Sequence, residues 1–154
     1  MKKLLEILTE KNITLAAAES CTGGMVCETV TSMPGASAVF LGGVVSYANE
    51  VKINVLGVSA DDLLKYGAVS ETVAAQMAEG VCRATGADIG ISTTGIAGPG
   101  GGTPEKPVGT VCFGISSKNG TRTYTCRFGA DKERDEIRRL AADYALSLAL
   151  QEVI

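Results

Sequence analysis

The order of apolar and polar positions along the chain switches between helical and strand periodicity. Apolar residues at helical spacing predict a helix at each end, over 1–12 and 131–152, and a long one over 71–85. Shorter helices are predicted over 22–33 and from Asn49 to Leu56. Short apolar runs predict buried strands. The expected strands are 14–18, 39–47, 88–94, 108–116 and 122–128.

The segments between these elements carry turn and capping residues. Pro34-Gly35 ends the second helix, and Ser70 and Asn49 are expected N-caps. Asn119-Gly120 separates the last two strands and predicts a hairpin. Alternating helices and strands with one hairpin predict an α/β fold. We expect one domain over 1–154, a three-layer α/β/α sandwich with a mixed sheet.

Composition excludes several classes of protein. The chain is 45% hydrophobic and 20% charged, which excludes a disordered chain. It holds no run of about 18 apolar residues, so no membrane span is expected. The formal net charge of −3 and the 5% aromatic content disfavour a nucleic-acid partner. We therefore expect a cytoplasmic protein without nucleic-acid or membrane partners.

The chain contains no histidine, and this limits its chemistry most. Ser-His-Asp and Cys-His sites are excluded, as are zinc sites that use histidine. The five cysteines form no CxxC pair, so neither a disulfide framework nor a four-cysteine zinc site is expected. Proton transfer near neutral pH must use a carboxylate, a lysine, a tyrosine or a cysteine. No metal is expected.

The first candidate site is the segment 19–24, Glu-Ser-Cys-Thr-Gly-Gly, where a buried strand turns into a helix. A helix N-terminus offers unpaired N–H groups and partial positive charge. Such a turn can hold a phosphate or stabilise an oxyanion. Ser20 or Thr22 can equally serve as a simple helix cap.

The second candidate is the segment 46–52, Ser-Tyr-Ala-Asn-Glu-Val-Lys. Lys52 falls in the first turn of the predicted helix, where the helix dipole and any burial favour the neutral amine. A lysine with a lowered pKa can act as a general base. A solvated surface lysine is the alternative.

Two further segments could hold an anion. The Gly/Pro-rich loop 95–107 matches neither a P-loop nor GxGxxG, because Thr103 replaces the last glycine. It can form an anion-binding nest, a flexible cover or a subunit contact. Arg134 and Arg138 share a helix face that suits a phosphate. Pairing with neighbouring carboxylates is the alternative.

Together these segments resemble a known family. A-E-S-C-T-G-G (18–24), S-Y-A-N-E-V-K (46–52), G-A-V-S-E-T-V (67–73) and T-G-I-A-G-P-G-G-G-T-P-E-K-P-V-G-T-V (94–111) follow one another along the chain. They are similar to the CinA carboxy-terminal domain family, whose enzymatic members are nicotinamide-nucleotide amidases. The family also occurs fused behind a nucleotide-processing domain, and this chain resembles the stand-alone form.

The resemblance implies hydrolysis of nicotinamide mononucleotide to nicotinic acid mononucleotide and ammonia, in pyridine-nucleotide recycling and without cofactor or metal. It implies that Ser20 is the nucleophile, Lys52 its base and Tyr47 a hydrogen-bonding or proton-relay neighbour. The expected substrate-binding residues are Thr22, Gly23, Gly24, Thr94, Gly95, Gly98, Gly100, Gly101 and Arg138. The segment before Arg138 departs from the family's G-D-R-x-x-x-R pattern, because three extra residues follow Gly129.

Two alternatives remain from the residues themselves. Cys21 could be the nucleophile, with Glu19 and Lys52, but neighbouring residues of an extended segment point to opposite sides. Ser20 and Cys21 are therefore not expected to share a pocket. The chain could also be a non-catalytic nucleotide-binding or partner-binding module. The apolar last helix and the glycine loop would support a homodimer.

Overall fold

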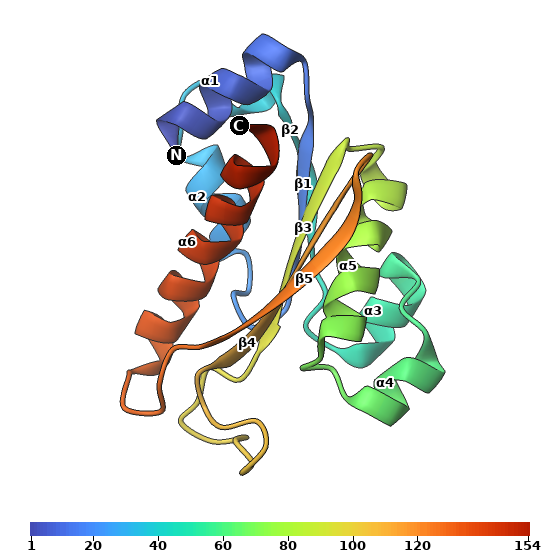
Figure 1. Cartoon of the computed structure of the whole chain (residues 1–154), viewed down its shortest axis with the longest axis vertical. Helices are drawn as coiled ribbons and strands as arrows, with labels where there is room; N and C mark the ends of the chain where they lie inside the picture. Colours follow the sequence, from blue (N-terminus) through green and yellow to red (C-terminus); the bar gives the residue numbers. More distant parts are fainter.

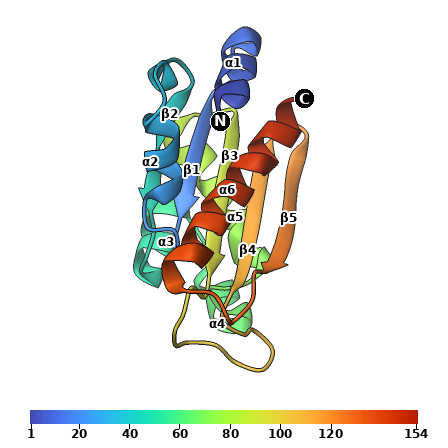
Figure 2. The same ribbon diagram turned by 90° about the vertical axis from the view of Figure 1, so that its left-hand side faces the viewer.

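Helices cover both faces of one mixed sheet (Figures 1 and 2). The computed structural model describes all residues, 1–154. The strands are β1 (Leu15–Glu19), β2 (Phe40–Val45), β3 (Ile89–Gly95), β4 (Thr110–Ser117) and β5 (Gly120–Arg127). The helices are α1 (Lys2–Lys11), α2 (Met25–Thr31), α3 (Asn49–Leu56), α4 (Ala60–Tyr66), α5 (Glu71–Thr85) and α6 (Arg134–Val153), with a short 3₁₀ turn η1 (Ala36–Ala38). The predicted α/β fold is confirmed.

The strand order brings three chain segments to one edge of the sheet. The order is β2-β1-β3-β4-β5. β1 runs parallel to β2 and to β3, whereas β4 is antiparallel to both β3 and β5. The carboxyl ends of β1, β2 and β3 therefore meet at the same edge, where open α/β sheets usually bind their ligands.

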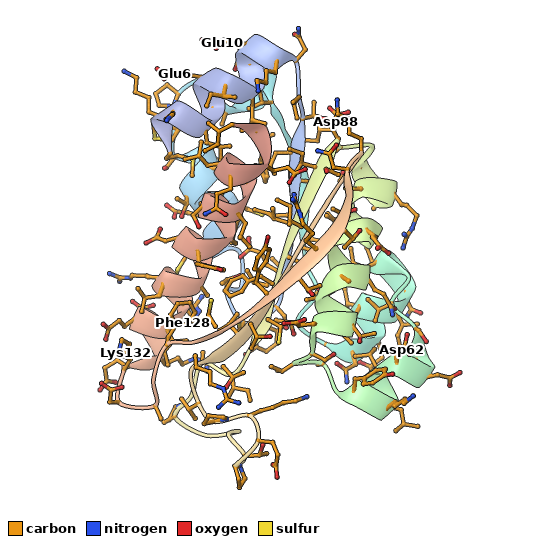
Figure 3. All side chains as sticks on the ribbon, in the orientation of Figure 1. Glu6, Glu10, Asp62, Asp88, Phe128 and Lys132 are labelled. Atoms are coloured by element: carbon orange, nitrogen blue, oxygen red, sulfur yellow. The ribbon has the colours of Figure 1, made fainter.

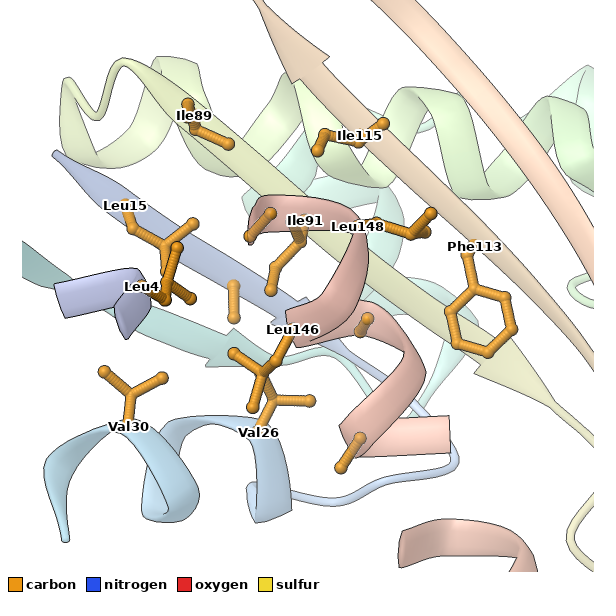
Figure 4. Close-up of a cluster of buried hydrophobic side chains, with 14 of the residues drawn as sticks. Leu4, Leu15, Val26, Val30, Ile89, Ile91, Phe113, Ile115, Leu146 and Leu148 are labelled. Carbon is orange, nitrogen blue, oxygen red and sulfur yellow. The ribbon is translucent and has the colours of Figure 1, made fainter. Parts of the chain in front are cut away.

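The sheet separates two hydrophobic cores. On one face, α1, α2 and α6 pack against the sheet around side chains that include Leu15, Val26, Phe113 and Leu146 (Figure 4). On the other face, α3, α4 and α5 pack around Ala16, Ala18 and the apolar side of α5. Successive residues of β1 thus face opposite cores, as the period of a strand requires.

Two predicted helices begin three residues too early. α2 begins at Met25 and not at residue 22, because Gly23 and Gly24 adopt left-handed φ angles of +58° and +103°. These two residues form a turn that returns the chain from β1 to the helix. α6 begins at Arg134 and not at residue 131, because Gly129 (φ +107°) turns the chain after β5 and Glu133 is the N-cap.

Of the capping and hairpin predictions, some are confirmed and others are wrong. Ser70 caps α5, since its side chain accepts a hydrogen bond from the Val73 amide. Asn49 is not the cap of α3, because that position belongs to Ala48. The hairpin is confirmed, but Ser117 pairs with Gly120, so the turn residues are 118–119.

The polar surface is distributed over all of the helices. Charged side chains such as Glu6 and Glu10 of α1, Asp62 of α4 and Lys132 in the turn before α6 project outward (Figure 3). None of the helices is both long enough and apolar enough to cross a membrane.

Candidate active site

The candidate site lies at the carboxyl ends of the parallel strands. Ser20 directly follows β1, Ser46 and Tyr47 follow β2, and the glycine loop follows β3. In Figures 1 and 2 this is the lower end of the molecule, where α6 also begins. The structure therefore brings together three segments that are far apart in the sequence.

Ser20 and Lys52 form the centre of this site. The Nζ atom of Lys52 lies 3.1 Å from the Oγ atom of Ser20. It also lies 2.6 Å from the carbonyl oxygen of Ser46 and 3.4 Å from that of Tyr47. Lys52 is only 1% exposed, so it is not the solvated surface lysine that was the alternative.

The surroundings of Lys52 favour its neutral form. Burial lowers the pKa of its ammonium, and no carboxylate forms an ion pair with it. A neutral amine has two hydrogens and one lone pair. The carbonyl oxygens of Ser46 and Tyr47 can accept the two hydrogens, which leaves the lone pair for the Ser20 hydroxyl.

Cys21 lies on the other side of the turn. Its thiol is buried in the core between the sheet, α2 and α6. Burial raises its pKa to about 12, with a further contribution from the negative charge of Glu19. A buried thiol with a raised pKa is a poor nucleophile. The geometry therefore favours Ser20 over the cysteine alternative.

The side chain of Glu19 caps the N-terminus of α2, a role that the sequence analysis gave to Ser20 or Thr22. Its carboxylate accepts hydrogen bonds from the amides of Gly24, Val26 and Cys27. The N-terminus of α2 is thus already capped by a protein carboxylate. It is not free to hold a phosphate, and the amide of Gly24, which was expected to bind substrate, is already bonded to Glu19.

Other polar groups of the turn that carries Ser20 also form hydrogen bonds within the protein. The Gly23 amide donates to the carbonyl oxygen of Ser20. Thr22 is fully buried, and its hydroxyl contacts Glu19 and Thr93, so that side chain does not reach a substrate. The amides of Cys21 and Thr22 donate to no protein acceptor. These two N–H groups are the free donors closest in sequence to Ser20.

Tyr47 belongs to the site but does not contact the serine–lysine pair through its ring. Its side chain is 62% exposed. Its hydroxyl accepts a hydrogen bond from Arg134 at 3.2 Å, and the other guanidinium NH₂ group of Arg134 donates to the carbonyl oxygen of Gly98 at 2.6 Å. Arg134 therefore joins the segment after β2 to the glycine loop, and it makes no ion pair.

Arg138 holds the turn that carries Ser20. Its guanidinium donates to the carbonyl oxygens of Cys21 (3.1 Å) and Thr22 (3.0 Å). It also forms a 3.5 Å ion pair with Asp135. Arg138 thus lies at the site, as the sequence analysis expected. Its guanidinium is already used in hydrogen bonds to the main chain and in the ion pair with Asp135.

The glycine loop has a structural part and an open part. Thr94 is buried and donates to the carbonyl oxygen of Ala68, and a side chain at Gly95 would collide with β4. Gly98 contributes its carbonyl oxygen to Arg134. Gly100 and Gly101 are exposed. Of the loop residues expected to bind substrate, only these last two are open to solvent.

Four residues of the site were missed or undervalued by the sequence analysis. Arg134 was noted only as a partner of Arg138 on one helix face. Glu19 was considered only as a partner of Cys21, although a charged residue at the end of an apolar strand is itself a signal. Ser46 acts through its main-chain carbonyl, and Thr93 through a buried hydroxyl. Neither of these last two roles has a signal in the sequence.

Fold and site together define the class of this protein. It is an α/β protein with a serine and a buried lysine in contact at the carboxyl ends of its parallel strands. The model of the CinA C-terminal domain matches residues 1–153. The chain belongs to this family.

Relatives and solved structures agree with this assignment. A CinA-like protein of Chlorobaculum tepidum is 50% identical over 140 residues, which cover 88% of this chain and 33% of the relative. A CinA-like protein of Gloeobacter violaceus is 47% identical over 96% of this chain and 35% of its own length. The chain thus spans about a third of the length of these curated relatives.

Among solved structures, the competence/damage inducible protein CihA from Agrobacterium tumefaciens superposes with a TM-score of 0.94 at 38% identity. The match covers 97% of this chain and 91% of that one. A CinA superfamily protein from Escherichia coli superposes with a TM-score of 0.90 at 34% identity, over 95% and 84% of the two chains. The fold described above is therefore that of the CinA superfamily.

Proposed function

We propose that this chain is an amidohydrolase that converts nicotinamide mononucleotide to nicotinic acid mononucleotide and ammonia. The observation that carries the proposal is the buried Lys52 amine, 3.1 Å from the Ser20 hydroxyl and without a countercharge. A serine next to a neutral lysine is an activated nucleophile. The substrate is inferred from the family resemblance. Its hydrolysis would be a reaction of pyridine-nucleotide recycling in the cytoplasm.

The reaction proceeds in two halves. The amine of Lys52 takes the Ser20 proton while Oγ attacks the carboxamide carbon. The amides of Cys21 and Thr22 donate to the oxyanion that forms, the usual role of free N–H groups next to a nucleophile. The C–N bond then breaks, and the proton on Lys52 passes to the leaving nitrogen to give ammonia. In the second half, water attacks the carbonyl carbon of the acyl-enzyme while Lys52 takes a proton from it. The bond from this carbon to Ser20 Oγ then breaks, Lys52 returns the proton to Oγ, and the product leaves as the carboxylate after its acidic proton passes to solvent.

Arg134 is the side chain best placed to hold the phosphate of the nucleotide. Its partners are the uncharged Tyr47 hydroxyl and Gly98 carbonyl, so its positive charge is not compensated within the chain. Arg138 is paired with Asp135. Guanidinium groups suit phosphate geometry. In this proposal Gly100 and Gly101 contact the bound nucleotide. Arg138 stabilises the turn that carries Ser20.

The proposal is tested by ammonia release from nicotinamide mononucleotide. We expect the wild type to release ammonia and Ser20→Ala to lose at least about a thousandfold in kcat, as for other enzymes without their nucleophile. Cys21→Ala is the matched control and should retain turnover. Both variants are first compared by circular dichroism for an intact fold.

Other results would point to other functions. Turnover retained by Ser20→Ala and lost by Cys21→Ala would assign the chemistry to the cysteine. Nucleotide binding by calorimetry without ammonia release would favour the non-catalytic binding module.

A further inference from the structure

The carboxylate of Glu19 is buried against the turn that carries Ser20. Glu19 is the only fully buried carboxylate in the chain, at 0% exposed. Its Oε1 atom accepts from the Cys27 amide at 2.8 Å. Its Oε2 atom accepts from the amides of Gly24 and Val26, both at 3.0 Å. One charged group therefore holds three amides of the turn and the first residues of α2.

A chain of hydroxyls joins the same carboxylate to β3. The Oγ1 atom of Thr22 lies 2.5 Å from Oε2 of Glu19 and 2.7 Å from Oγ1 of Thr93. The Thr22 hydroxyl donates to Glu19, which uses its single hydrogen. Thr93 must then donate to Thr22. The Ser20 amide also donates to the carbonyl oxygen of Thr93, at 2.9 Å. The Ser20 turn is thus fixed to β3 by two separate contacts.

The main chain of Glu19 reaches the other half of the pair. Its carbonyl oxygen accepts from the Ser46 amide at 2.7 Å and from the Ser46 hydroxyl at 3.3 Å. The carbonyl oxygen of Ser46 in turn lies 2.6 Å from Nζ of Lys52. Glu19 therefore contacts both the turn that presents the serine and the segment that orients the lysine.

We propose that Glu19, acting through Thr22, is a positioning residue for the nucleophile. Its carboxylate holds the turn so that Ser20 Oγ stays within hydrogen-bond distance of Lys52 Nζ. The inference rests on the proposed function, because it assigns Glu19 to the activation of Ser20. It differs from simple helix capping, which would stabilise α2 without affecting the chemistry of the folded protein.

The test separates catalysis from stability by measuring kcat per folded molecule. Glu19→Gln replaces one accepting oxygen by an NH₂ group that meets backbone donors. Thr22→Val keeps the shape of threonine and removes the hydroxyl, whereas Thr22→Ser restores the hydroxyl. We expect Glu19→Gln and Thr22→Val to lower kcat by about tenfold or more with KM changed by less than about twofold, because a small displacement of the nucleophile slows the reaction without weakening substrate binding. Thr22→Ser should stay within about threefold of the wild type.

Glu152→Gln is the matched control for a buried carboxylate. The Glu152 side chain is 3% exposed, forms an ion pair with Arg122, and accepts hydrogen bonds from Ser117 and Asn119. It lies near the end of α6, at the opposite end of the molecule from Ser20 (Figure 1). This variant should lower the melting temperature while its kcat per folded molecule stays unchanged. If Glu19→Gln behaves in the same way as Glu152→Gln, Glu19 is only a cap and the inference is overturned.

A second measurement keeps the inference testable without the nucleotide. A fluorophosphonate reagent labels activated serines, and peptide mass spectrometry locates the label. We expect labelling of Ser20 in the wild type and about tenfold slower labelling in Glu19→Gln and Thr22→Val. Labelling with this pattern, but no ammonia from nicotinamide mononucleotide, would overturn the proposed substrate and support the role of Glu19. Equal labelling in all of these proteins would overturn the role of Glu19. No labelling and no ammonia in the wild type would overturn both.

Discussion

At the scale of single residues, the amine of Lys52 is the most unusual group in the molecule. It is a lysine that is buried without a negative partner, which is costly for its charged form. Its polar contacts are a hydroxyl and two carbonyl oxygens, all uncharged. Such an environment is typical of a lysine that works as a base.

The lowered pKa of Lys52 predicts the pH dependence of turnover. Only the unprotonated amine can accept the Ser20 proton, so kcat/KM rises with pH and levels off above the pKa of Lys52. Because burial lowers this pKa from its ordinary 10.5, the plateau begins at a lower pH than for an exposed lysine. The measurement is a pH–rate profile of ammonia release.

Two variants serve as controls for this profile. Lys3→Met removes an exposed lysine on α1 and should leave the profile unchanged. Lys52→Met should abolish turnover. A rising limb that persists in Lys52→Met would assign it to another group.

The sequence could predict part of the site at this scale. The family resemblance implied the Ser20–Lys52 pair, and the absence of histidine agreed with it. The alternation along a strand was enough to separate Ser20 from Cys21. The capping of α2 by Glu19 could not be predicted, because the chain must first double back through Gly23 and Gly24. Sequence distance alone gives no sign that the amide of Cys27 meets a carboxylate eight residues earlier.

At the scale of elements, the position of Lys52 depends on how α3 packs against α5. Gly80 lies inside α5 at the crossing, and a Cβ atom there would overlap the carbonyl oxygen of Leu56. Arg83 of α5 also donates to the same carbonyl, at 3.1 Å. The missing side chain of Gly80 thus allows the helix that carries Lys52 to sit close to α5.

This contact reverses the usual effect of replacing glycine in a helix. Alanine is normally favoured over glycine in a helix interior by about 1 kcal/mol. Gly80→Ala should instead lower the free energy of unfolding by about 1–3 kcal/mol, the range for overpacked cores. Urea denaturation measures the change.

Gly100→Ala is the control for this prediction, because a Cβ atom at Gly100 meets nothing within 4 Å. Its free energy of unfolding should change by less than about 0.5 kcal/mol, as for other surface changes. A stabilised Gly80→Ala would contradict the packing of α3 on α5.

The elements themselves were largely predictable, and the errors have a common cause. Long amphipathic helices such as α5 were located because their periodicity is strong. The starts of α2 and α6 were misplaced because each follows a glycine with a left-handed φ angle. Such a glycine can turn the chain or lie inside an element, and only the tertiary contacts decide which.

At the scale of the whole molecule, the two edges of the sheet differ in their protection. β5 carries Arg122 and Arg127 along its exposed edge, and charged residues on an edge discourage pairing with another chain. β2 has no charged residue, and Leu41 and Val45 are 47% and 48% exposed. The β2 edge is therefore the one open to a second copy.

We expect a homodimer that forms through this edge, and not through the last helix and glycine loop that the sequence suggested. Light scattering should give about twice the 15.8 kDa mass of one chain. Leu41→Lys places a charge on the edge and should shift the protein to the monomer, whereas Leu64→Lys, at a 90% exposed leucine of α4 away from this edge, should not. A single-chain mass at all concentrations would contradict the expectation.

The most direct test of the serine–lysine account is to trap the acyl-enzyme. The wild type is mixed with nicotinamide mononucleotide, quenched with acid within one turnover, digested and analysed by mass spectrometry. The account predicts a peptide containing Ser20 that is heavier by the mass of the nucleotide minus ammonia, with the adduct on Ser20 and absent from Ser20→Ala. An adduct on Cys21, or ammonia release that persists in a folded Ser20→Ala protein, would contradict it.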